Sequence, residues 1–469
     1  MEDYSKEKIL QILESHIKIT NKKKQQFGEV LTPLSIIDSI FNEFPKDVWK
    51  NKDLKWLEPS SGVGNFTVSL FYKLMKGLED IIKNPKERAN HIVSSMIYMI
   101  EIDEENVKTC INIFHTLCPS SKPNIWKGNF LDISSKEGIS LEQFPKEFDI
   151  ILGNPPYNTA GTKRKGIKRV HIIFTERSLQ SLKPQGILSF ICPPNYRESN
   201  SIMNSHFLNK KGSFLFIKIY SSEDTYRIFK IQARVDAFIY RKGAIREKTK
   251  IIDEFNIESH IKLDLTDSIP NFGYSIFDKL RKKVLELGYI NGYRTTEMTT
   301  VDRESFSAGK HKLLHLIISE GRRIIKVSKK HSLEEKPKIF INGLGVPYVF
   351  YDKKGEYGCT QVPIVILNPT DTLNNLLQTK LFNFIAWGLR LTGNNNLPYI
   401  LKSVPDIRND ISFKKKDINQ YLSLTKKEIE FIEKNFIVPS SEDKNLNESI
   451  QKTRKNKLIN IKTRKIRRF

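Results

Sequence analysis

The sequence of 469 residues lacks long apolar runs and has few cysteines. No run reaches the roughly 18 apolar residues that a membrane-spanning helix requires. The N-terminus does not have the basic-then-apolar order of a secretory signal. Four scattered cysteines without paired spacing predict reduced thiols and no zinc site; they are Cys110, Cys118, Cys192 and Cys359. We therefore expect a cytoplasmic protein without a membrane or metal partner.

His311 and His315 show a spacing of four residues, which is that of one helix face. No acidic or cysteine ligand stands between them, so we expect ordinary helix residues and not metal ligands.

Acidic residues are scarce relative to basic ones. The chain has 53 Asp and Glu against 77 Lys and Arg, a net charge of +24. Lys and Arg gain affinity by releasing counterions from phosphates, so a polyanionic partner is indicated. Coding bias toward lysine is the alternative source of this surplus. A chain of this length also exceeds one ordinary core, which predicts two domains, or one domain with a large appended module.

The region from residue 54 to 243 alternates short apolar runs with helical segments, the pattern of a parallel sheet covered by helices. It predicts a doubly wound, Rossmann-like α/β domain. The expected strands cover residues 55–58, 96–102, 125–128, 148–153, 186–192, 215–220 and 235–241.

The segments around this region have a different character. An amphipathic helix is expected over residues 3–20, followed by a basic stretch. After about residue 246 the alternation ends, with a hairpin-like piece at 348–360 and helical sequence at 373–392. The last 20 residues hold nine Lys or Arg and no acid, and are expected to be disordered or to serve as a nuclear address. We predict an N-terminal helix and linker (1–24), an α/β domain (25–245), a mixed α+β domain (246–438) and a basic tail (439–469).

A glycine-containing turn follows the first expected strand, in the segment from Glu58 to Phe66. Gly62 and Gly64 allow the backbone to bend and approach a bound cofactor closely. Glu101 ends the second expected strand, where a carboxylate can accept hydrogen bonds from ribose hydroxyls. The 39 residues from Gly62 to Glu101 exceed the roughly 20 of dinucleotide folds, so residues 68–95 must supply additional helix.

The fourth expected strand runs into Asn154-Pro155-Pro156-Tyr157. This tetrapeptide would lie at the carboxyl edge of the sheet, where open α/β sheets bind ligands. Adenine N6 is a poor nucleophile because its lone pair is delocalised, and it needs acceptors for its hydrogens. Asn154 Oδ1 and the Pro155 carbonyl can accept them, and Tyr157 can stack on the base and position it.

Basic residues accompany these motifs. The segment just beyond the tetrapeptide has no acid and is suited to phosphates; it contains Lys163, Arg164, Lys165, Lys168 and Arg169. Residues 321–330 form a second basic run that includes Arg322 and Arg323, for which a solvated face is the alternative.

Together these ordered motifs resemble the gamma class of adenine-N6 DNA methyltransferases from restriction-modification systems and their viral relatives. Phe27 to Pro33 is similar to the N-terminal cofactor element of that family, and Gly128 to Leu131 to its adenine-contacting element, with Asn129 in place of the usual Asp. Tyr226 to Phe229 resembles a late motif whose aromatic residue stacks on the flipped base, and Phe229 is the predicted stacker opposite Tyr157.

The resemblance implies S-adenosylmethionine as cofactor and double-stranded DNA as substrate, reached by base flipping. It further implies that residues 246–438 recognise the target sequence, with a separately encoded restriction endonuclease as a candidate partner of a monomeric enzyme. The implied cofactor site comprises Thr32, Pro33, Glu58, Pro59, Ser60, Gly62, Gly64, Phe66, Glu101, Ile102, Asn129, Phe130 and Asn154.

Three alternatives stay open. The same chemistry can act on cytosine N4, an RNA base or a protein glutamine. A bifunctional restriction enzyme is the second, but only a weak nuclease-like pattern is present at Pro405-Asp406 and Glu442-Asp443-Lys444, and about 25 residues before the first cofactor element are too few for a nuclease domain. An inactive DNA-binding subunit is the third, against which Glu58, Glu101 and Asn154 argue.

Overall fold

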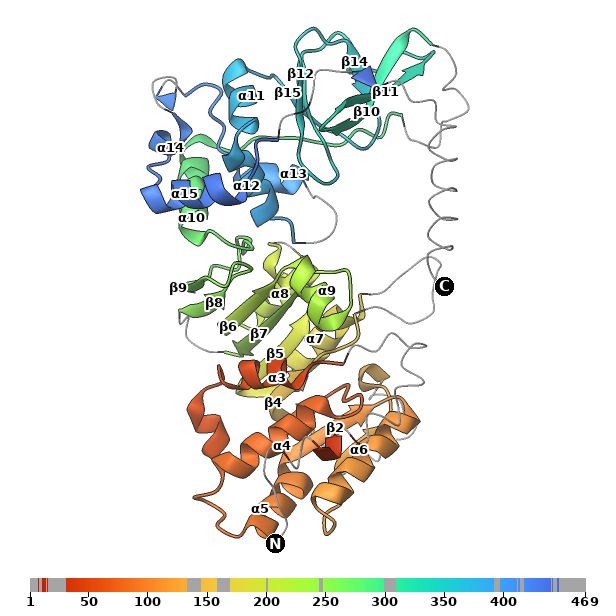
Figure 1. Ribbon diagram of the computed structural model, residues 1–469, viewed down its shortest axis with the longest axis vertical. Coiled ribbons are helices and arrows are strands. Elements are labelled where there is room, and N and C mark those ends of the chain that lie inside the picture. Colours follow the sequence, from red (N-terminus) through yellow and green to blue (C-terminus); the bar gives the residue numbers. More distant parts are fainter. Residues whose placement is uncertain are drawn as a thin grey trace. The chain divides into compact units, whose positions relative to one another are not determined.

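The computed structural model forms two compact units, Met1–Ile269 and Pro270–Phe469 (Figure 1). The described residues are 7, 11–13, 15, 31–132, 145–157, 169–199, 201–243, 248–298, 309–391, 397–410, 412–413, 417–439, 441 and 445–446. Among them, no helix is long and apolar enough to cross a membrane.

The first unit is built on a nine-stranded sheet of order β3-β2-β1-β4-β5-β7-β6-β8-β9. Strands β1 to β5 are parallel where they pair, and β7 runs antiparallel between β5 and β6. Central parallel strands are buried on both faces, which is why they appear as continuous apolar runs in the sequence. The strands are β1 Trp56–Glu58, β2 Ile97–Glu101, β3 Asn124–Lys127, β4 Phe148–Gly153, β5 Leu182–Cys192, β6 Ser213–Tyr220, β7 Val235–Arg241, β8 Thr249–Ile252 and β9 Glu258–Ile261.

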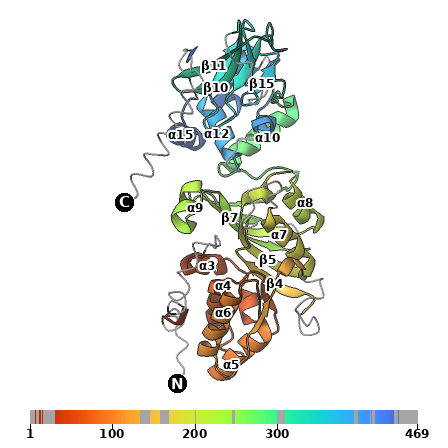
Figure 2. The ribbon, with the colours of Figure 1, turned by 90° about the vertical axis from the view of Figure 1, so that its right-hand side faces the viewer.

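Helices cover both faces of this sheet: α3, α4 and α6 lie on one side and α7 and α8 on the other (Figure 2). The doubly wound α/β class and all seven expected strands are thereby confirmed. The helices are α3 Leu34–Phe41, α4 Asn65–Gly77, α5 Pro85–His91, α6 Glu104–Leu117, α7 Val170–Ser181, α8 Ile202–Asn209 and α9 Ser222–Phe229. Short turns of helix are η1 Lys46–Lys50, η2 Ile92–Met96, η3 Phe130–Asp132 and η4 Pro194–Arg197.

The long separation between the glycine turn and Glu101 has the expected cause. Helices α4 and α5 and the π-helical turn η2 fill the interval before β2. The N-terminal helix is present at its described positions 7, 11–13 and 15, where Leu13 is buried against the core of the first unit.

The expected domain boundary at residue 245 is too early. Strand β8 pairs in parallel with β6, and β9 pairs with β8, so both belong to the first sheet. Their short length and the irregular sequence around them concealed this continuation, and the first unit extends to Ile269.

The second unit is a mixed α+β structure with its own apolar core. Its strands form a four-stranded sheet, β14-β10-β11-β16, and a three-stranded sheet, β13-β12-β15. The strands are β10 His311–Ile318, β11 Gly321–Val327, β12 Lys338–Ile341, β13 Val349–Asp352, β14 Tyr357–Cys359, β15 Ile364–Leu367 and β16 Asn445–Leu446. The helices are α10 Tyr274–Leu287, α11 Asp371–Leu377, α12 Lys380–Gly388, α13 Leu397–Ile400, α14 Ile418–Tyr421 and α15 Lys426–Asn435, with the 3-10 turn η6 Leu401–Ser403.

Two expectations for this unit are wrong. His311 and His315 lie on strand β10 and not on a helix, because strand pairing overrides the four-residue spacing. The hairpin expected at 348–360 does not form, since β13 pairs with β12 and β14 pairs with β10. Strand β16 pairs with β11, whereas residues 450–469, where disorder is expected, lie outside the described residues. The helical sequence at 373–392 is confirmed through α11 and α12.

Candidate active site

Three parallel strands bring the sequence motifs to one edge of the sheet. Strand β1 pairs with β2 on one side and with β4 on the other. Their carboxyl ends carry Glu58, Glu101 and Asn154, and the Ser61 amide donates to the Ile100 carbonyl at 3.0 Å. The topology therefore gathers residues that are far apart in the sequence.

The glycine turn adopts backbone angles that favour glycine, with φ of 53° at Gly62 and 91° at Gly64. A Cβ built on Gly62 would meet no heavy atom within 4 Å, whereas one on Gly64 would lie 3.2 Å from Cys110 Sγ. The Cys110 thiol also donates to the Gly62 carbonyl at 3.3 Å. The turn is thus closed on the side of α6 and open in front of Gly62.

Glu101 is fixed beside this turn. The Gly62 amide donates to Oε2 at 2.7 Å, and the Asp103 amide donates to Oε1 at 2.8 Å. Ile102, the next residue along, is 67% exposed. A fixed carboxylate and an exposed apolar side chain lie side by side at the strand end, as a nucleoside site requires.

Glu58 is a buried acid of the site with one carboxylate oxygen that lacks a hydrogen-bond partner among the described residues. Its side chain is 3% exposed, and among the described residues Oε2 has no hydrogen-bond partner. Burial, and next the charge of Glu101, raise the pKa of Glu58 well above its usual range. Ser60 Oγ is likewise buried without a partner in the described chain. These atoms are suited to receive a polar or cationic group.

The tetrapeptide is tied to the N-terminal element. Asn154 Nδ2 donates to Thr32 Oγ1 at 3.2 Å, and the Tyr157 hydroxyl donates to Asn154 Oδ1 at 2.9 Å. Thr32 is buried, and its carbonyl accepts from Asn65 Nδ2 at 2.9 Å. Thr32 therefore connects the tetrapeptide to the first turn of α4.

Tyr157 is held from its backbone as well. Its carbonyl accepts from the Val170 amide and from His171 Nδ1, both at 3.1 Å. The rings of Tyr157 and His171 meet edge to face, with centroids 6.1 Å apart. Burial is the main cause that raises the pKa of Tyr157 well above its usual range. Sequence reasoning missed His171, whose only signal is a polar residue among the apolar positions of α7.

The adenine-contacting element is only partly as expected. The Gly128 amide donates to the Glu101 carbonyl at 2.9 Å, which places the segment next to the site. Asn129, however, is engaged locally: Nδ2 donates to Asp132 Oδ2 at 2.6 Å and Oδ1 accepts from the Leu131 amide. Phe130 is buried against Phe174, with ring centroids 5.5 Å apart.

The remaining members of the expected cofactor site line the same turn and edge. Pro59 and Phe66 are buried, and Phe66 packs in the core of the first unit. Pro33 precedes α3 as its N-cap. Pro155 is buried and Pro156 exposed. Phe27 to Val30 lie outside the described residues.

Phe229, the predicted stacking residue, is buried in the core of the first unit. It is 5% exposed and packs in the core against Tyr220, with centroids 6.2 Å apart. Tyr226, one turn earlier on α9, is 54% exposed, and Lys230 Nζ lies 6.0 Å from its ring centroid. The motif is present, but its exposed aromatic residue is Tyr226, because Phe229 falls on the apolar face of the amphipathic helix.

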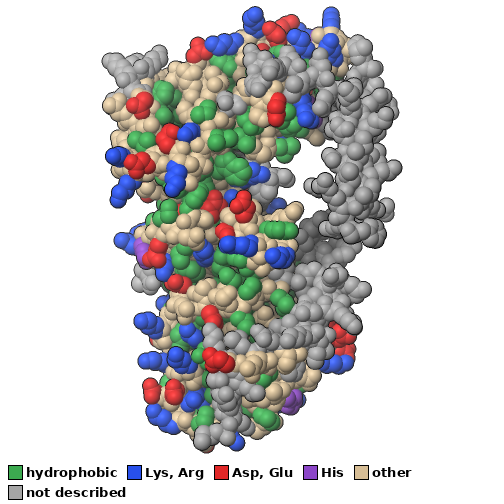
Figure 3. All heavy atoms as spheres, viewed as in Figure 1, with side chains coloured by type: hydrophobic (Ala, Val, Ile, Leu, Met, Phe, Trp, Pro, Cys, Tyr) green, Lys and Arg blue, Asp and Glu red, His purple; other side chains and the backbone are tan. Residues whose placement is uncertain are grey.

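The basic residues differ in accessibility. Arg169 is exposed at the start of α7, while Lys163, Arg164, Lys165 and Lys168 lie outside the described residues. Arg322 and Arg323 are half-buried on β11, where the Arg322 guanidinium lies 4.1 Å from the Phe350 ring centroid. On the face seen in Figure 3, Lys and Arg are spread among other side chains and do not form one patch.

Comparisons with known proteins extend this description. Residues 68–229 match the family model described as Eco57I restriction-modification methylase. A relative described as an uncharacterized adenine-specific methylase, from Mycoplasma pneumoniae, is 40% identical over 156 residues, which are 32% of this chain and 35% of the relative. The matched part thus spans about a third of the relative's length.

The solved structures similar to this chain include two from restriction-modification systems. A modification subunit of a putative type I restriction enzyme from Vibrio vulnificus is 16% identical, with a TM-score of 0.39, over 53% of each chain. The type IIL restriction-modification enzyme MmeI, in complex with DNA, is 12% identical, with a TM-score of 0.48, over 83% of this chain and 66% of that one.

The segment from residue 68 to 229 contains β2, Glu101, the tetrapeptide and α9, so the family match covers these motifs. The glycine turn from Glu58 to Phe66 and the element from Phe27 to Pro33 precede it. The resemblance to the adenine-N6 methyltransferases of restriction-modification systems is therefore confirmed for this segment.

Proposed function

We propose that the chain transfers a methyl group from S-adenosylmethionine to the N6 amine of adenine in DNA. The observation that carries this proposal is the tetrapeptide at the carboxyl edge of the sheet, with Asn154 bonded to Thr32 beside the glycine turn. In one place the site offers an amide, a proline carbonyl and an aromatic ring, which are the groups that an exocyclic amine on a planar base requires.

The residues at the turn fit the cofactor. Gly62 leaves open space, Glu101 offers a carboxylate for ribose hydroxyls, and Glu58 Oε2 is an unpartnered acceptor among the described atoms for the ammonium of the methionine moiety. Ile102 offers an apolar surface to the adenine ring. When bound, S-adenosylmethionine supplies an electrophilic methyl group on a positively charged sulfur.

Asn154 orients the amine. Its Nδ2 is engaged by Thr32, so Oδ1 is the atom that accepts from N6, together with the Pro155 carbonyl. Accepting both hydrogens favours a more tetrahedral nitrogen and directs its lone pair at the methyl group. Catalysis then depends on positioning, and no general base is assigned.

A duplex buries adenine N6 in the base stack, so the nucleotide must be flipped out. We infer that Tyr157 stacks on one face of the base and that Tyr226, in place of Phe229, contacts the other. Arg169 is exposed and immediately precedes Val170, whose amide donates to the Tyr157 carbonyl. We infer that Arg169 contacts a phosphate next to the flipped base.

We assign target recognition to the second unit, from Pro270 to about residue 438. Its mixed α+β structure has a separate core and carries basic strand β11. A separately encoded endonuclease is the partner that this function calls for.

The proposal is tested by Asn154→Ala in the full chain. We expect methyl transfer to DNA lacking N6-methyladenine to fall by at least about 100-fold, because the variant loses the amide oxygen that is proposed to accept from the reacting amine. Affinity for S-adenosylmethionine, measured by calorimetry, should stay within about threefold of wild type because Glu58 and Glu101 are intact.

Single-molecule sequencing of the product DNA identifies the modified atom and its sequence context. Methylation at cytosine N4, or equal turnover by the wild type and Asn154→Ala, contradicts the proposal.

A further inference from the structure

His171 stands out as a buried polar side chain whose ring nitrogens both face polar atoms. It lies in the first turn of α7 and is 2% exposed. Nδ1 lies 3.1 Å from the Tyr157 carbonyl, and Nε2 lies 2.9 Å from Asn195 Oδ1. The Tyr157 carbonyl and Asn195 Oδ1 are both oxygens that can only accept. A neutral ring with its proton on Nδ1 donates to the Tyr157 carbonyl, and Nε2 then accepts from Asn195 when the Asn195 side-chain amide is turned to present Nδ2.

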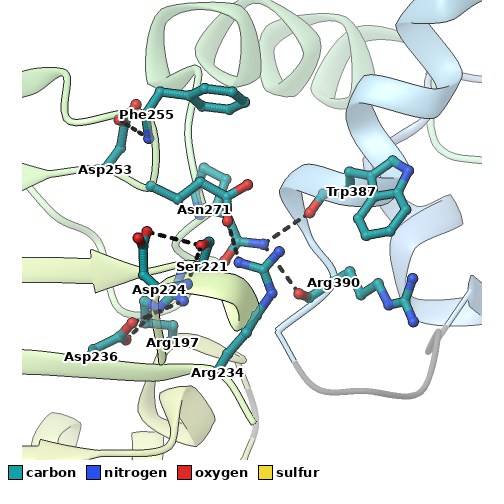
Figure 4. A network of polar contacts seen from close by, with 12 residues as sticks. Arg197, Ser221, Asp224, Arg234, Asp236, Asp253, Phe255, Asn271, Trp387 and Arg390 are labelled. Atoms are coloured by element: carbon teal, nitrogen blue, oxygen red, sulfur yellow. Dashed lines mark hydrogen bonds and ion pairs between the residues drawn. The ribbon is translucent and has the colours of Figure 1, made fainter. Parts of the chain in front are cut away.

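The far side of the ring rests on a rigid support. Asn195 is buried in η4, and its carbonyl accepts from Ser201 Oγ at 2.5 Å. The next two residues are bonded to β7. The Tyr196 hydroxyl donates to Asp236 Oδ2 at 2.9 Å. Arg197 Nε donates to the same atom at 2.7 Å, and Figure 4 shows this pair. Arg197 and Asp236 are both fully buried, so water does not screen or weaken the ion pair between them.

On the side of the tetrapeptide, the His171 ring makes two contacts with Tyr157. It donates to the Tyr157 backbone and places an edge against the Tyr157 ring. Tyr157 in turn donates to Asn154 Oδ1. The orientation of both side chains proposed to handle the base therefore depends on where His171 holds Tyr157.

We infer that His171 is a positioning residue, which fixes Tyr157 and through it Asn154 for methyl transfer. The inference rests on the proposed function, because the geometry that it preserves is that of the reacting base. Small displacements of reacting groups lower turnover far more than they lower binding.

The test compares three variants of the full chain. His171→Leu removes both the ring and the bond to Tyr157, whereas His171→Asn places Nδ2 close to the position of Nδ1 and keeps that bond. Thr175→Val is the matched control. Thr175 is fully buried one turn later on α7 and donates to the His171 carbonyl at 2.8 Å, and among the described residues it makes no hydrogen bond to Tyr157.

We expect His171→Leu to lower kcat by about 10-fold or more, with the KM for S-adenosylmethionine within about twofold of wild type. His171→Asn should recover most of kcat, and Thr175→Val should retain kcat whatever its melting temperature. An unchanged kcat in His171→Leu, or a His171→Asn variant as slow as His171→Leu, overturns the inference.

Amide hydrogen exchange provides a readout that does not depend on activity. Peptides covering residues 150–157 should exchange faster in His171→Leu than in wild type or Thr175→Val. If wild type transfers no methyl group, the proposed function fails, and the exchange data still decide whether His171 holds the tetrapeptide. Equal exchange in all chains refutes the positioning role.

Discussion

Glu58 combines deep burial with an acceptor atom that lacks a partner among the described residues. A buried carboxylate is costly in free energy unless it is paired or protonated. Desolvation together with the nearby charge of Glu101 favours the protonated form, which is the cause of the raised pKa of Glu58. The proposed cofactor site thus carries a local destabilisation that a bound ammonium group would relieve.

This destabilisation predicts an unusual pH dependence. The folded chain binds the Glu58 proton more tightly than the unfolded chain does, so stability falls as pH rises from about 4.5 through the raised folded pKa. Glu58→Gln, which keeps the shape without the charge, should raise the melting temperature of the cofactor-free chain near pH 8 by about 3 °C and weaken cofactor binding.

Scanning calorimetry between pH 5 and pH 8 checks this prediction. The gap between wild type and Glu58→Gln should widen with pH, whereas Glu105→Gln, at an exposed position on α6, should follow wild type. If the melting temperatures of wild type and Glu58→Gln change in parallel with pH, then Glu58 is not the cause of the pH-dependent loss of stability.

Tyr226 and Phe229 can be separated by their effects. Tyr226→Ala should lower kcat/KM for DNA by about 10-fold, as stacking of 1–3 kcal/mol per base implies, and leave the melting temperature unchanged because the ring is exposed. Phe229→Leu should lower the melting temperature, since its ring packs in the core, and retain kcat/KM. The reverse pattern would restore Phe229 as the stacking residue.

At the scale of elements, the sequence predicts what depends on local pattern. Buried parallel strands and the Pro-Pro turn are local signals, so β1 to β7 and the tetrapeptide were found at their places. Elements that depend on pairing with distant strands were not predicted. Strands β8 and β9 are too short to indicate a sheet, and β13 and β14 pair with strands of two different sheets.

The candidate site follows the same rule. Glu58, Glu101 and Asn154 each end a strand, so their meeting could be predicted from topology. His171 could not, because its role depends on contacts across 14 and 24 residues of chain that have no sequence signature. The choice between Tyr226 and Phe229 required the packed face of α9.

At the scale of the whole molecule, the net charge of +24 predicts binding to duplex DNA that weakens steeply with salt. Arg169→Gln should reduce the slope of log K against log salt by about 1, which is the effect of one lost phosphate contact. Lys83→Gln is the control, because Lys83 follows α4 at the amino edge of the sheet and pairs with Asp80. Fluorescence anisotropy with the full chain at several salt concentrations measures both slopes, and equal slopes would remove Arg169 from the interface.

The hydrogen bond from the Tyr157 hydroxyl to Asn154 Oδ1 has a consequence for selectivity. In the structure, the Tyr157 hydroxyl already occupies one lone pair of Asn154 Oδ1, the oxygen that is proposed to accept from the adenine amine. An incoming base therefore shares Asn154 Oδ1 with the Tyr157 hydroxyl or displaces that hydroxyl. The free energy gained at this atom is then the difference between the hydrogen bond from the base and the hydrogen bond from Tyr157. Thymine presents its O4 carbonyl, an acceptor, where adenine presents its amino group, so at that position it offers no donor to replace the Tyr157 hydroxyl. We therefore expect the tetrapeptide to discriminate against thymine at the binding step.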